Sequence, residues 1–184
     1  AGKTSLLNVL VGFEKPARGI LDGPHSLYWS PQDGGLWPHC TAREHLALVR
    51  CAEARIDELL AAFDLAERAE ARPHELSEGE RSRLSVARAL AAPAPVLVLD
   101  EPLAHVDPAR AARYWTAIRA ALGDRSLVFA THEPEAVLGE AAHVICLRDG
   151  QVLHAGPVGE TYADPPSREV MDCLGPGNWL TPEE

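Results

Sequence analysis

Apolar positions along the chain change their spacing, and each spacing indicates a different kind of element. The apolar run from Leu6 to Val11 predicts a buried helix that ends near Gly12. A second stripe repeats at i, i+3, i+4 and i+7, the period of one helical face, and is formed by Ile56, Leu59, Leu60 and Phe63. Residues 76–92 and about 108–122 are predicted as further helices.

Short unbroken apolar runs predict strands instead. Four consecutive apolar residues, Val96 to Leu99, are typical of a strand that is buried on both faces. Residues 126–132 repeat this pattern, and residues 19–32 indicate short strands and turns. Residues 143–156 contain two short apolar runs on either side of Asp149-Gly150, a dipeptide that predicts a β-hairpin.

This order of elements predicts an α/β fold. Strands that alternate with helices indicate a parallel sheet flanked by helices. The helical span 42–92 lies between sheet elements and is predicted to form an inserted lobe within one domain, residues 1–184. The tail, residues 157–184, is rich in Pro and Gly and is predicted to be less regular.

Composition narrows the function classes. The formal net charge is −10, with 17 Lys and Arg against 27 Asp and Glu, which argues against nucleic-acid binding. The four cysteines are widely spaced, so we expect free thiols rather than a zinc site or disulfides. Without a membrane-spanning run or signal peptide, we expect a soluble protein or one held at a membrane by a partner. The chain opens at Ala1 directly on a motif, which indicates a fragment.

The opening tripeptide Gly2-Lys3-Thr4 is the closing half of a phosphate-binding loop, GxxxxGK[ST]. In that loop, backbone N–H groups at a helix start hold phosphate, the lysine reaches the β- and γ-phosphates, and the hydroxyl binds Mg²⁺. Half a motif is weak alone, because the same tripeptide is commonly a solvated helix start.

Support comes from the strand that ends in Asp100-Glu101. Its carboxyl end is where ligands bind in open α/β sheets. There Asp100 is suited to the water shell of Mg²⁺, and Glu101 to accepting a proton from an attacking water. An isolated acidic pair would instead be read as a turn after a core strand.

Ser77 and Glu80 form the pattern S-x-x-E, a capping box at a helix start. The same helix start presents a hydroxyl, the Gly79 N–H and the positive end of a dipole, which together suit an anion. Both interpretations are compatible.

These motifs and their order resemble the ABC-type ATPases. "LSEGERSRLSVARAL" is similar to the family signature LSGGQ with its helix, and "VLVLDEP" follows it at the usual separation. Gln32 matches the Q-loop, Asp107 the D-loop and His132 the switch histidine. The fold implied is a P-loop NTPase sheet with the ABC signature lobe inserted.

The resemblance implies a residue set for each role. Catalysis would use Glu101, His132 and Gln32, and Asp107 would contact a second subunit. Mg²⁺ would be held by Thr4, Gln32 and Asp100. ATP would contact Gly2, Lys3, Thr4, Ser5, Gln32, Ser77, Gly79, Asp100 and His132.

It also implies partners and a location. Two nucleotide-binding subunits would form a head-to-tail dimer with ATP between them, in which Ser77 and Gly79 act on the other copy's nucleotide. The dimer would drive transmembrane permease subunits from the cytoplasmic, inner face of the cell membrane. The tail "GPVGETYADPPSREVMDCLGPGN" resembles bacterial importer ATPases for polyamines, ferric iron, sulfate or sugars, many of which continue into a regulatory domain.

The chain departs from the family pattern at two signature positions. Glu78 replaces a Gly and Glu80 the Gln, and added carboxylates near a γ-phosphate would weaken its binding. The stretch from Lys3 to Gln32 is shorter than usual, so we expect a trimmed strand and loop there.

Two alternatives remain open. One is a soluble ABC-type ATPase that acts on nucleic acid or the ribosome, which the acidic charge and the short segment 33–75 between Gln32 and Leu76 disfavour. The other is a subunit that does not hydrolyse ATP, against which Glu101 and His132 argue.

Overall fold

The structure is a computed structural model that describes residues 2–23 and 26–175. These residues divide into two compact units: a larger unit of residues 7–130, and a smaller one of residues 2–6 and 131–175. Helix α1 (Lys3–Leu10) is the first element of the chain, and it ends two residues before the predicted end at Gly12.

A three-stranded parallel sheet in the order β1-β2-β3 lies at the centre of the larger unit. The central strand β2 is buried from Leu97 to Asp100, as its apolar run predicts, and pairs with β1 on one side and β3 on the other. The bounds of the three strands are β1 (Tyr28–Ser30), β2 (Val96–Asp100) and β3 (Ser126–Ala130). The predicted parallel α/β sheet is therefore confirmed.

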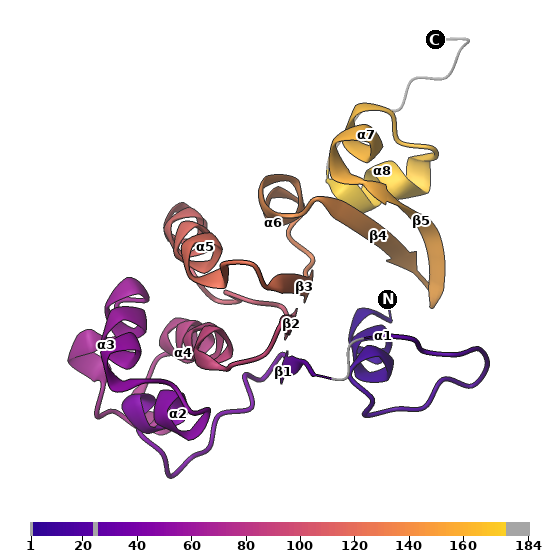
Figure 1. The fold of residues 1–184 in the computed structure, drawn as a ribbon. Coiled ribbons are helices and arrows are strands. Elements are labelled where there is room, and N and C mark those ends of the chain that lie inside the picture. The colour runs from indigo at the N-terminus through magenta and orange to yellow at the C-terminus, as the bar shows by residue number, and fades with distance from the viewer. Residues whose placement is uncertain (1, 24–25, 176–184) are drawn as a thin grey trace. The chain divides into compact units, whose positions relative to one another are not determined.

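The helices that connect β1, β2 and β3 lie on one side of this sheet (Figure 1). Helix α4 packs against β1 and β2 and also contacts α2, α3 and α5. The helices are α2 (Ala42–Leu48), α3 (Glu53–Ala62), α4 (Glu78–Ala91) and α5 (Pro108–Leu122), with 3₁₀ turns η1 (Ala66–Arg68) and η2 (Pro73–Glu75). All the elements between β1 and β2, from α2 to α4, are helical. This agrees with the predicted helical span 42–92.

The core of the larger unit is built from the predicted stripe and its partners. Ile56, Leu59, Leu60 and Phe63 are at most 1% exposed. Phe63 stacks on Tyr114 of α5, with ring centroids 5.8 Å apart. The stripe therefore joins the helical span to a helix that follows β2.

The smaller unit contains the predicted hairpin. Strands β4 (His143–Arg148) and β5 (Gln151–Pro157) pair antiparallel, and Asp149 and Gly150 both have positive φ, as the favoured two-residue turn requires. Helix α6 (Pro134–Glu140) precedes the hairpin, and α7 (Val158–Ala163) and α8 (Arg168–Leu174) follow it.

The structure differs from the sequence-based expectations in the tail and in residues 19–32. The tail was expected to be less regular, yet its described part contains α7 and α8, and Val170 and Leu174 of α8 pack on Cys146 of β4. Helices of six and seven residues are too short to show a helical period in the sequence. Positions 176–184, including the tail's last importer-like residues, lie outside the described residues. Short strands were predicted in residues 19–32, but within 11–23 and 26–32 the only strand is β1.

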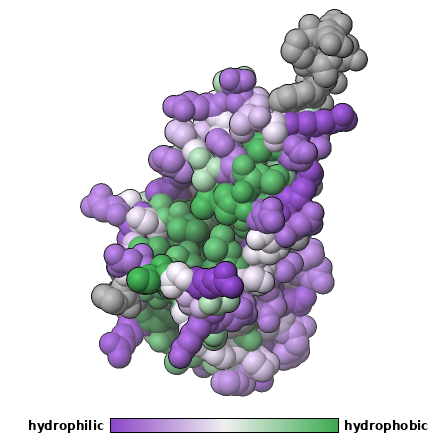
Figure 2. Space-filling model, turned by 90° about the vertical axis from the view of Figure 1, so that its right-hand side faces the viewer, coloured by the Kyte–Doolittle hydropathy of each residue, from purple (hydrophilic) through white to green (hydrophobic). Residues whose placement is uncertain are grey.

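Large apolar side chains are exposed in both units. Val128 of β3 is 38% exposed, and Ile145 and Val152 of the hairpin are 56% and 60% exposed. In Figure 2, exposed apolar side chains lie among polar ones. Apolar surface of this kind is typical of faces that contact another segment or chain. All four cysteines are free thiols.

Candidate functional site

Strand β2 delivers two carboxylates at its carboxyl end. Asp100 is the last residue of the strand and is 4% exposed. Glu101 is half-buried, and its N–H donates to the Ala130 carbonyl at 2.8 Å, which extends the pairing with β3 by one residue. Pairing with β1 on one side and β3 on the other therefore fixes the end of the strand that carries both acids.

The backbone after β2 is unusual. Glu101, Leu103 and His105 have φ values of 51°, 60° and 63°, in the left-handed region. That conformation costs a residue with a side chain on the order of 1–2 kcal/mol. Leu103 is 2% exposed, so its burial offsets part of this cost. Strain stored beside a carboxylate is a common property of functional sites.

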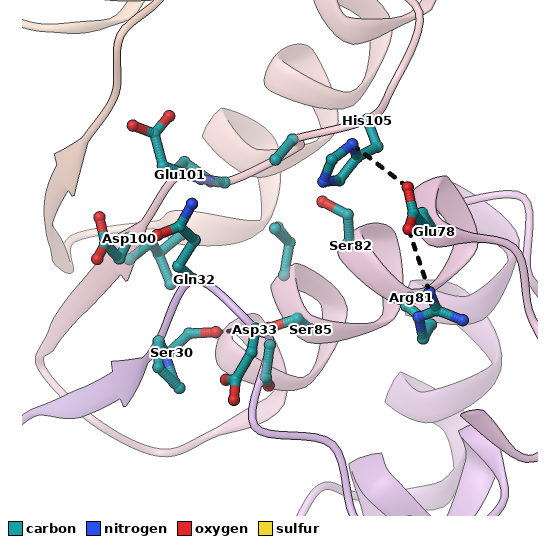
Figure 3. Close-up of a pocket in the computed structure, with 16 residues that line it drawn as sticks. Ser30, Gln32, Asp33, Glu78, Arg81, Ser82, Ser85, Asp100, Glu101 and His105 are labelled. Atoms are coloured by element: carbon teal, nitrogen blue, oxygen red, sulfur yellow. Dashed lines mark hydrogen bonds and ion pairs between the residues drawn. The ribbon is translucent and has the colours of Figure 1, made fainter. Parts of the chain in front are cut away.

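Gln32 comes to the same sheet edge from β1. Ser30 of β1 is in register with Leu99 of β2, and parallel strands end at the same edge. Gln32 therefore extends from the loop after β1 toward Asp100 and Glu101 (Figure 3).

These three side chains line one pocket of about 270 Å³ within the larger unit. All three are predicted from the sequence for the same site, and the structure brings them together. The pocket is lined by Ser30, Pro31, Gln32, Asp33, Gly34, Glu78, Arg81, Ser82, Ser85, Val86, Leu99, Asp100, Glu101, Pro102, Ala104 and His105.

Helix α4 forms the opposite wall of this pocket, from Glu78 in its first turn to Val86. Ser77 is the N-cap, and the predicted capping box is present: the Ser77 hydroxyl accepts from the Glu80 N–H, while Glu80 accepts from the Ser77 N–H at 2.8 Å. The Ser77 hydroxyl also donates to Glu80 at 2.8 Å. These Ser77 bonds, the backbone one foremost, and Arg68 lower the pKa of Glu80, although burial opposes them.

Glu78 is held between two basic side chains. Its carboxylate lies 3.5 Å from His105 Nδ1 and 3.8 Å from Arg81 Nη2 (Figure 3). The next residue, Gly79, lies so close to the segment after β2 that a Cβ there would be 3.0 Å from the His105 carbonyl oxygen. No role is predicted from the sequence for His105 or Arg81, although Arg81 lies within the stretch that resembles the family signature.

The predicted phosphate-binding residues at the start of the chain belong to the smaller unit. In the smaller unit, Gly2 has a φ of +93° and precedes α1, whose first residues are Lys3, Thr4 and Ser5. Their position at a helix start agrees with phosphate binding, since the N-terminal N–H groups have no partners within the helix.

Asp107 and His132 lie at turns. Asp107, in the larger unit, is the N-cap of α5, and its carboxylate accepts from the Ala109 N–H at 3.0 Å. This structural role was missed, although Asp107-Pro108 is a helix-start pattern. His132, in the smaller unit, is exposed in a turn where the Glu133 N–H donates to Thr131 Oγ1 at 3.1 Å.

Comparison with known proteins gives a consistent result. The ABC transporter family model matches residues 1–104. The Fe(3+) ions import ATP-binding protein FbpC of Yersinia pestis is 33% identical over 98% of this chain and 58% of its own length. The thiamine import ATP-binding protein ThiQ of Cereibacter sphaeroides is 35% identical over 95% of this chain and 84% of its own.

A third relative is the spermidine/putrescine import ATP-binding protein PotA 1 of Pseudomonas aeruginosa. It is 34% identical over 99% of this chain, and this chain spans 56% of its length. The chain thus spans little more than half of the iron and polyamine relatives.

Solved structures agree on the fold. A dimeric ATP-binding cassette in a post-hydrolysis state, bound to ADP and Pi, matches with a TM-score of 0.73 and 25% identity over 85% of this chain and 81% of its own. An Atm1-family ABC exporter with ATP bound matches with a TM-score of 0.79 over 97% of this chain and 36% of its own, at 20% identity.

The parallel sheet, the two acids that end its central strand and the capped helix opposite them define a nucleotide-binding domain of the P-loop class. Within that class, the chain belongs to the ABC transporter family. No helix among residues 2–23 and 26–175 is both long and apolar enough to cross a bilayer.

Proposed function

We propose that this protein is the nucleotide-binding subunit of an ABC transporter and that it hydrolyses ATP to ADP and phosphate. The observation that carries the proposal is the pocket in which Gln32, Asp100 and Glu101 meet at the end of a parallel sheet. An amide and two carboxylates at this place can bind a metal and accept a proton from a water.

Glu101 is proposed as the general base. It accepts a proton from the attacking water as the water oxygen bonds to the γ-phosphorus and the bond to the β-phosphate oxygen breaks. Asp100 and Gln32 supply oxygen atoms, the ligand type that Mg²⁺ prefers, so the residues present fit this ion. Thr4 is the proposed third ligand, from the family pattern. The ion would neutralise charge on the phosphates.

The phosphates of ATP are assigned to the start of α1. Gly2, Lys3, Thr4 and Ser5 are proposed to bind them through backbone N–H groups and the Lys3 ammonium. His132 is proposed to contact the γ-phosphate. These roles rest on the family pattern and on the helix start.

We propose further that the protein works as a head-to-tail dimer. Ser77 and Gly79 would contact the nucleotide of the second copy, and Asp107 would lie at the dimer contact. The dimeric state of a matched ATP-binding cassette supports this assembly. The helical span 42–92 is the proposed signature lobe of a single domain.

The proposed partner is a transmembrane permease, which places the subunit on the cytoplasmic, inner face of the cell membrane. Relatives named for import of iron, polyamines and thiamine favour an importer of a small solute. The net charge of −10 weighs against an alternative ABC-type ATPase acting on nucleic acid or the ribosome.

Phosphate release by the full-length protein tests the proposal. We expect release from ATP that requires Mg²⁺ and falls about 10²-fold or more in Lys3→Ala, because a charge contact to the transferring group is lost. Lys15→Ala is the matched control, since Lys15 is exposed and is the chain's other lysine. No Mg²⁺-dependent release from the wild type, or equal release by Lys3→Ala, would refute the assignment.

A further inference from the structure

Helix α4 contacts the chain on both sides of Gln32. Before Gln32, the Ser30 hydroxyl lies 2.5 Å from the Ser85 hydroxyl of α4. The Arg88 guanidinium of α4 lies over the Tyr28 ring of β1, with 6.0 Å between the guanidinium carbon and the ring centroid. The residues that lead into Gln32 are therefore held by two side chains one helical turn apart.

The same two side chains hold the loop after Gln32. Arg88 donates from Nη2 to the Gly34 carbonyl at 2.6 Å and from Nη1 to the Gly35 carbonyl at 2.8 Å. Ser85 also donates to the Gly34 carbonyl, at 3.2 Å. Since Ser85 has one hydroxyl proton, Ser30 must be the donor in the Ser30–Ser85 bond.

The loop needs its two glycines for this contact. Gly34 and Gly35 have φ values of +77° and +53°, which favour glycine. A Cβ on Gly34 would lie 3.3 Å from the Ser85 Cβ, and one on Gly35 would lie 3.2 Å from the Pro31 Cγ. The backbone can therefore approach α4 closely enough for its carbonyls to reach Arg88.

The charge of Arg88 serves this backbone contact. Arg88 is 3% exposed, and among the described residues no carboxylate forms an ion pair with it. A buried cation without a counter-ion is costly unless hydrogen bonds satisfy it. Here the carbonyls of two loop residues accept from both terminal nitrogens of Arg88, and the Trp37 ring covers the guanidinium at 4.9 Å, while Nε has no hydrogen-bond partner among the described residues.

His45 of helix α2 holds Trp37, the residue whose ring covers Arg88. His45 stacks on Trp37 with ring centroids 5.4 Å apart, and its Nε2 accepts from the Trp37 N–H at 2.9 Å. Its Nδ1 lies 2.7 Å from the Thr41 carbonyl, which fixes the neutral tautomer. Burial lowers the pKa of His45, and nearby Arg88 adds to this effect.

We propose that Arg88 is a positioning residue for Gln32. By fixing both flanks of Gln32 to α4, Arg88 and Ser85 set where the Gln32 amide lies in the pocket beside Asp100 and Glu101. A shift of α4 would then move Gln32 as well. The inference rests on the proposed ATP hydrolysis, because the position of Gln32 matters through that reaction.

A double-mutant cycle tests it. In the full-length protein, we expect Arg88→Lys to lower kcat about 10-fold or more and to leave KM for ATP within about twofold, since small displacements of a reacting arrangement are costly. In the Gln32→Ala background, the same substitution should change kcat less than about twofold, because residues that act through one group are not additive.

Arg125→Lys is the matched control. Arg125 also holds backbone carbonyls, among them Leu90 and Ala92 at the end of α4, but it does not contact the Gln32 loop. Any effect of Arg125→Lys should therefore be equal in both backgrounds. Ser85→Ala is the milder variant if Arg88→Lys unfolds, and its smaller loss of kcat should also vanish in the Gln32→Ala background.

Each outcome decides between the two proposals. Equal loss of kcat for Arg88→Lys with and without Gln32, or, if that variant unfolds, for Ser85→Ala, would overturn the positioning role and leave ATP hydrolysis standing. A wild-type protein without ATPase activity would instead overturn the proposed function itself. A loss of kcat that occurs when Gln32 is present and vanishes in Gln32→Ala supports the inference.

Discussion

Glu78 and Glu80 stand at signature positions where the family pattern has uncharged residues, and both carboxylates are engaged by neighbours. Glu80 accepts from Ser77 and lies 3.3 Å from Arg68. Glu78 lies between Arg81 and His105. The expected repulsion of a γ-phosphate is therefore reduced by Arg68 and Arg81, the cations that pair with these carboxylates, since opposite charges nearby screen each acid.

The capping box gives a prediction about pH. The pKa of Glu80 is lowered on folding, so its contribution to stability is present above its ordinary pKa of 4.5 and is lost as pH falls through the folded value. Glu80→Gln should therefore be less stable than the wild type at pH 7, and the difference should shrink as the pH falls below 4.5.

Urea unfolding at a series of pH values measures this difference. Glu67→Gln is the control, because Glu67 is exposed and the substitution removes the same charge. A Glu80→Gln deficit that stays constant from pH 7 to pH 3.5 would show that the carboxylate is not responsible.

Single residues were predictable where a local pattern encodes them. The S-x-x-E spacing is enough to predict the bonds between Ser77 and Glu80. Ser85 and Arg88 were missed, because their partners lie more than 50 positions earlier in the chain. The available signal was an Arg within the apolar run of α4, a position where a charge requires a buried partner.

At the scale of elements, the first turn of α4 packs against the segment after β2. The closest approach is at Gly79, where a Cβ would lie 3.0 Å from the His105 carbonyl oxygen, a backbone atom. His105 has a positive φ, so its backbone has little freedom to move away. The close spacing between these two elements therefore depends on a glycine, which has no Cβ, at position 79.

A pair of substitutions tests this dependence. Gly79→Ala should lower Tm, because its Cβ forces the two elements apart. Gly139→Ala, in α6, should leave Tm unchanged or raise it, since Ala favours a helix by up to about 1 kcal/mol over Gly and nothing lies within 4 Å of the new Cβ. Thermal unfolding of both variants provides the comparison. Equal shifts of the same sign would contradict the steric explanation.

Elements were predictable where they are long enough to show a pattern or are joined by a recognisable turn. Strand β2 and the hairpin at Asp149-Gly150 follow directly from an apolar run and a turn dipeptide. The short helices α6, α7 and α8 were not predicted, because seven residues or fewer hardly complete two turns. Their stability comes from packing, such as that of Val170 against Cys146.

At the scale of the whole molecule, the motifs predicted the fold class and family, and the comparisons confirm both. The pairing of β1 with β2 depends on contacts between distant segments, Tyr28 with Leu97 for example, which no local pattern specifies. The pocket at that edge nevertheless contains three residues assigned from sequence. Motif order was informative here because parallel strands bring their carboxyl ends to one edge.

The most direct test of the account is nucleotide binding and turnover of Glu101→Gln, measured side by side in the full-length protein. Glu135→Gln is the control, since Glu135 is an exposed glutamate in α6. We predict that Glu101→Gln binds ATP as tightly as the wild type but releases phosphate about 10²-fold more slowly or worse, because the proton acceptor is lost. Near-normal turnover with unchanged binding would show that another group is the base.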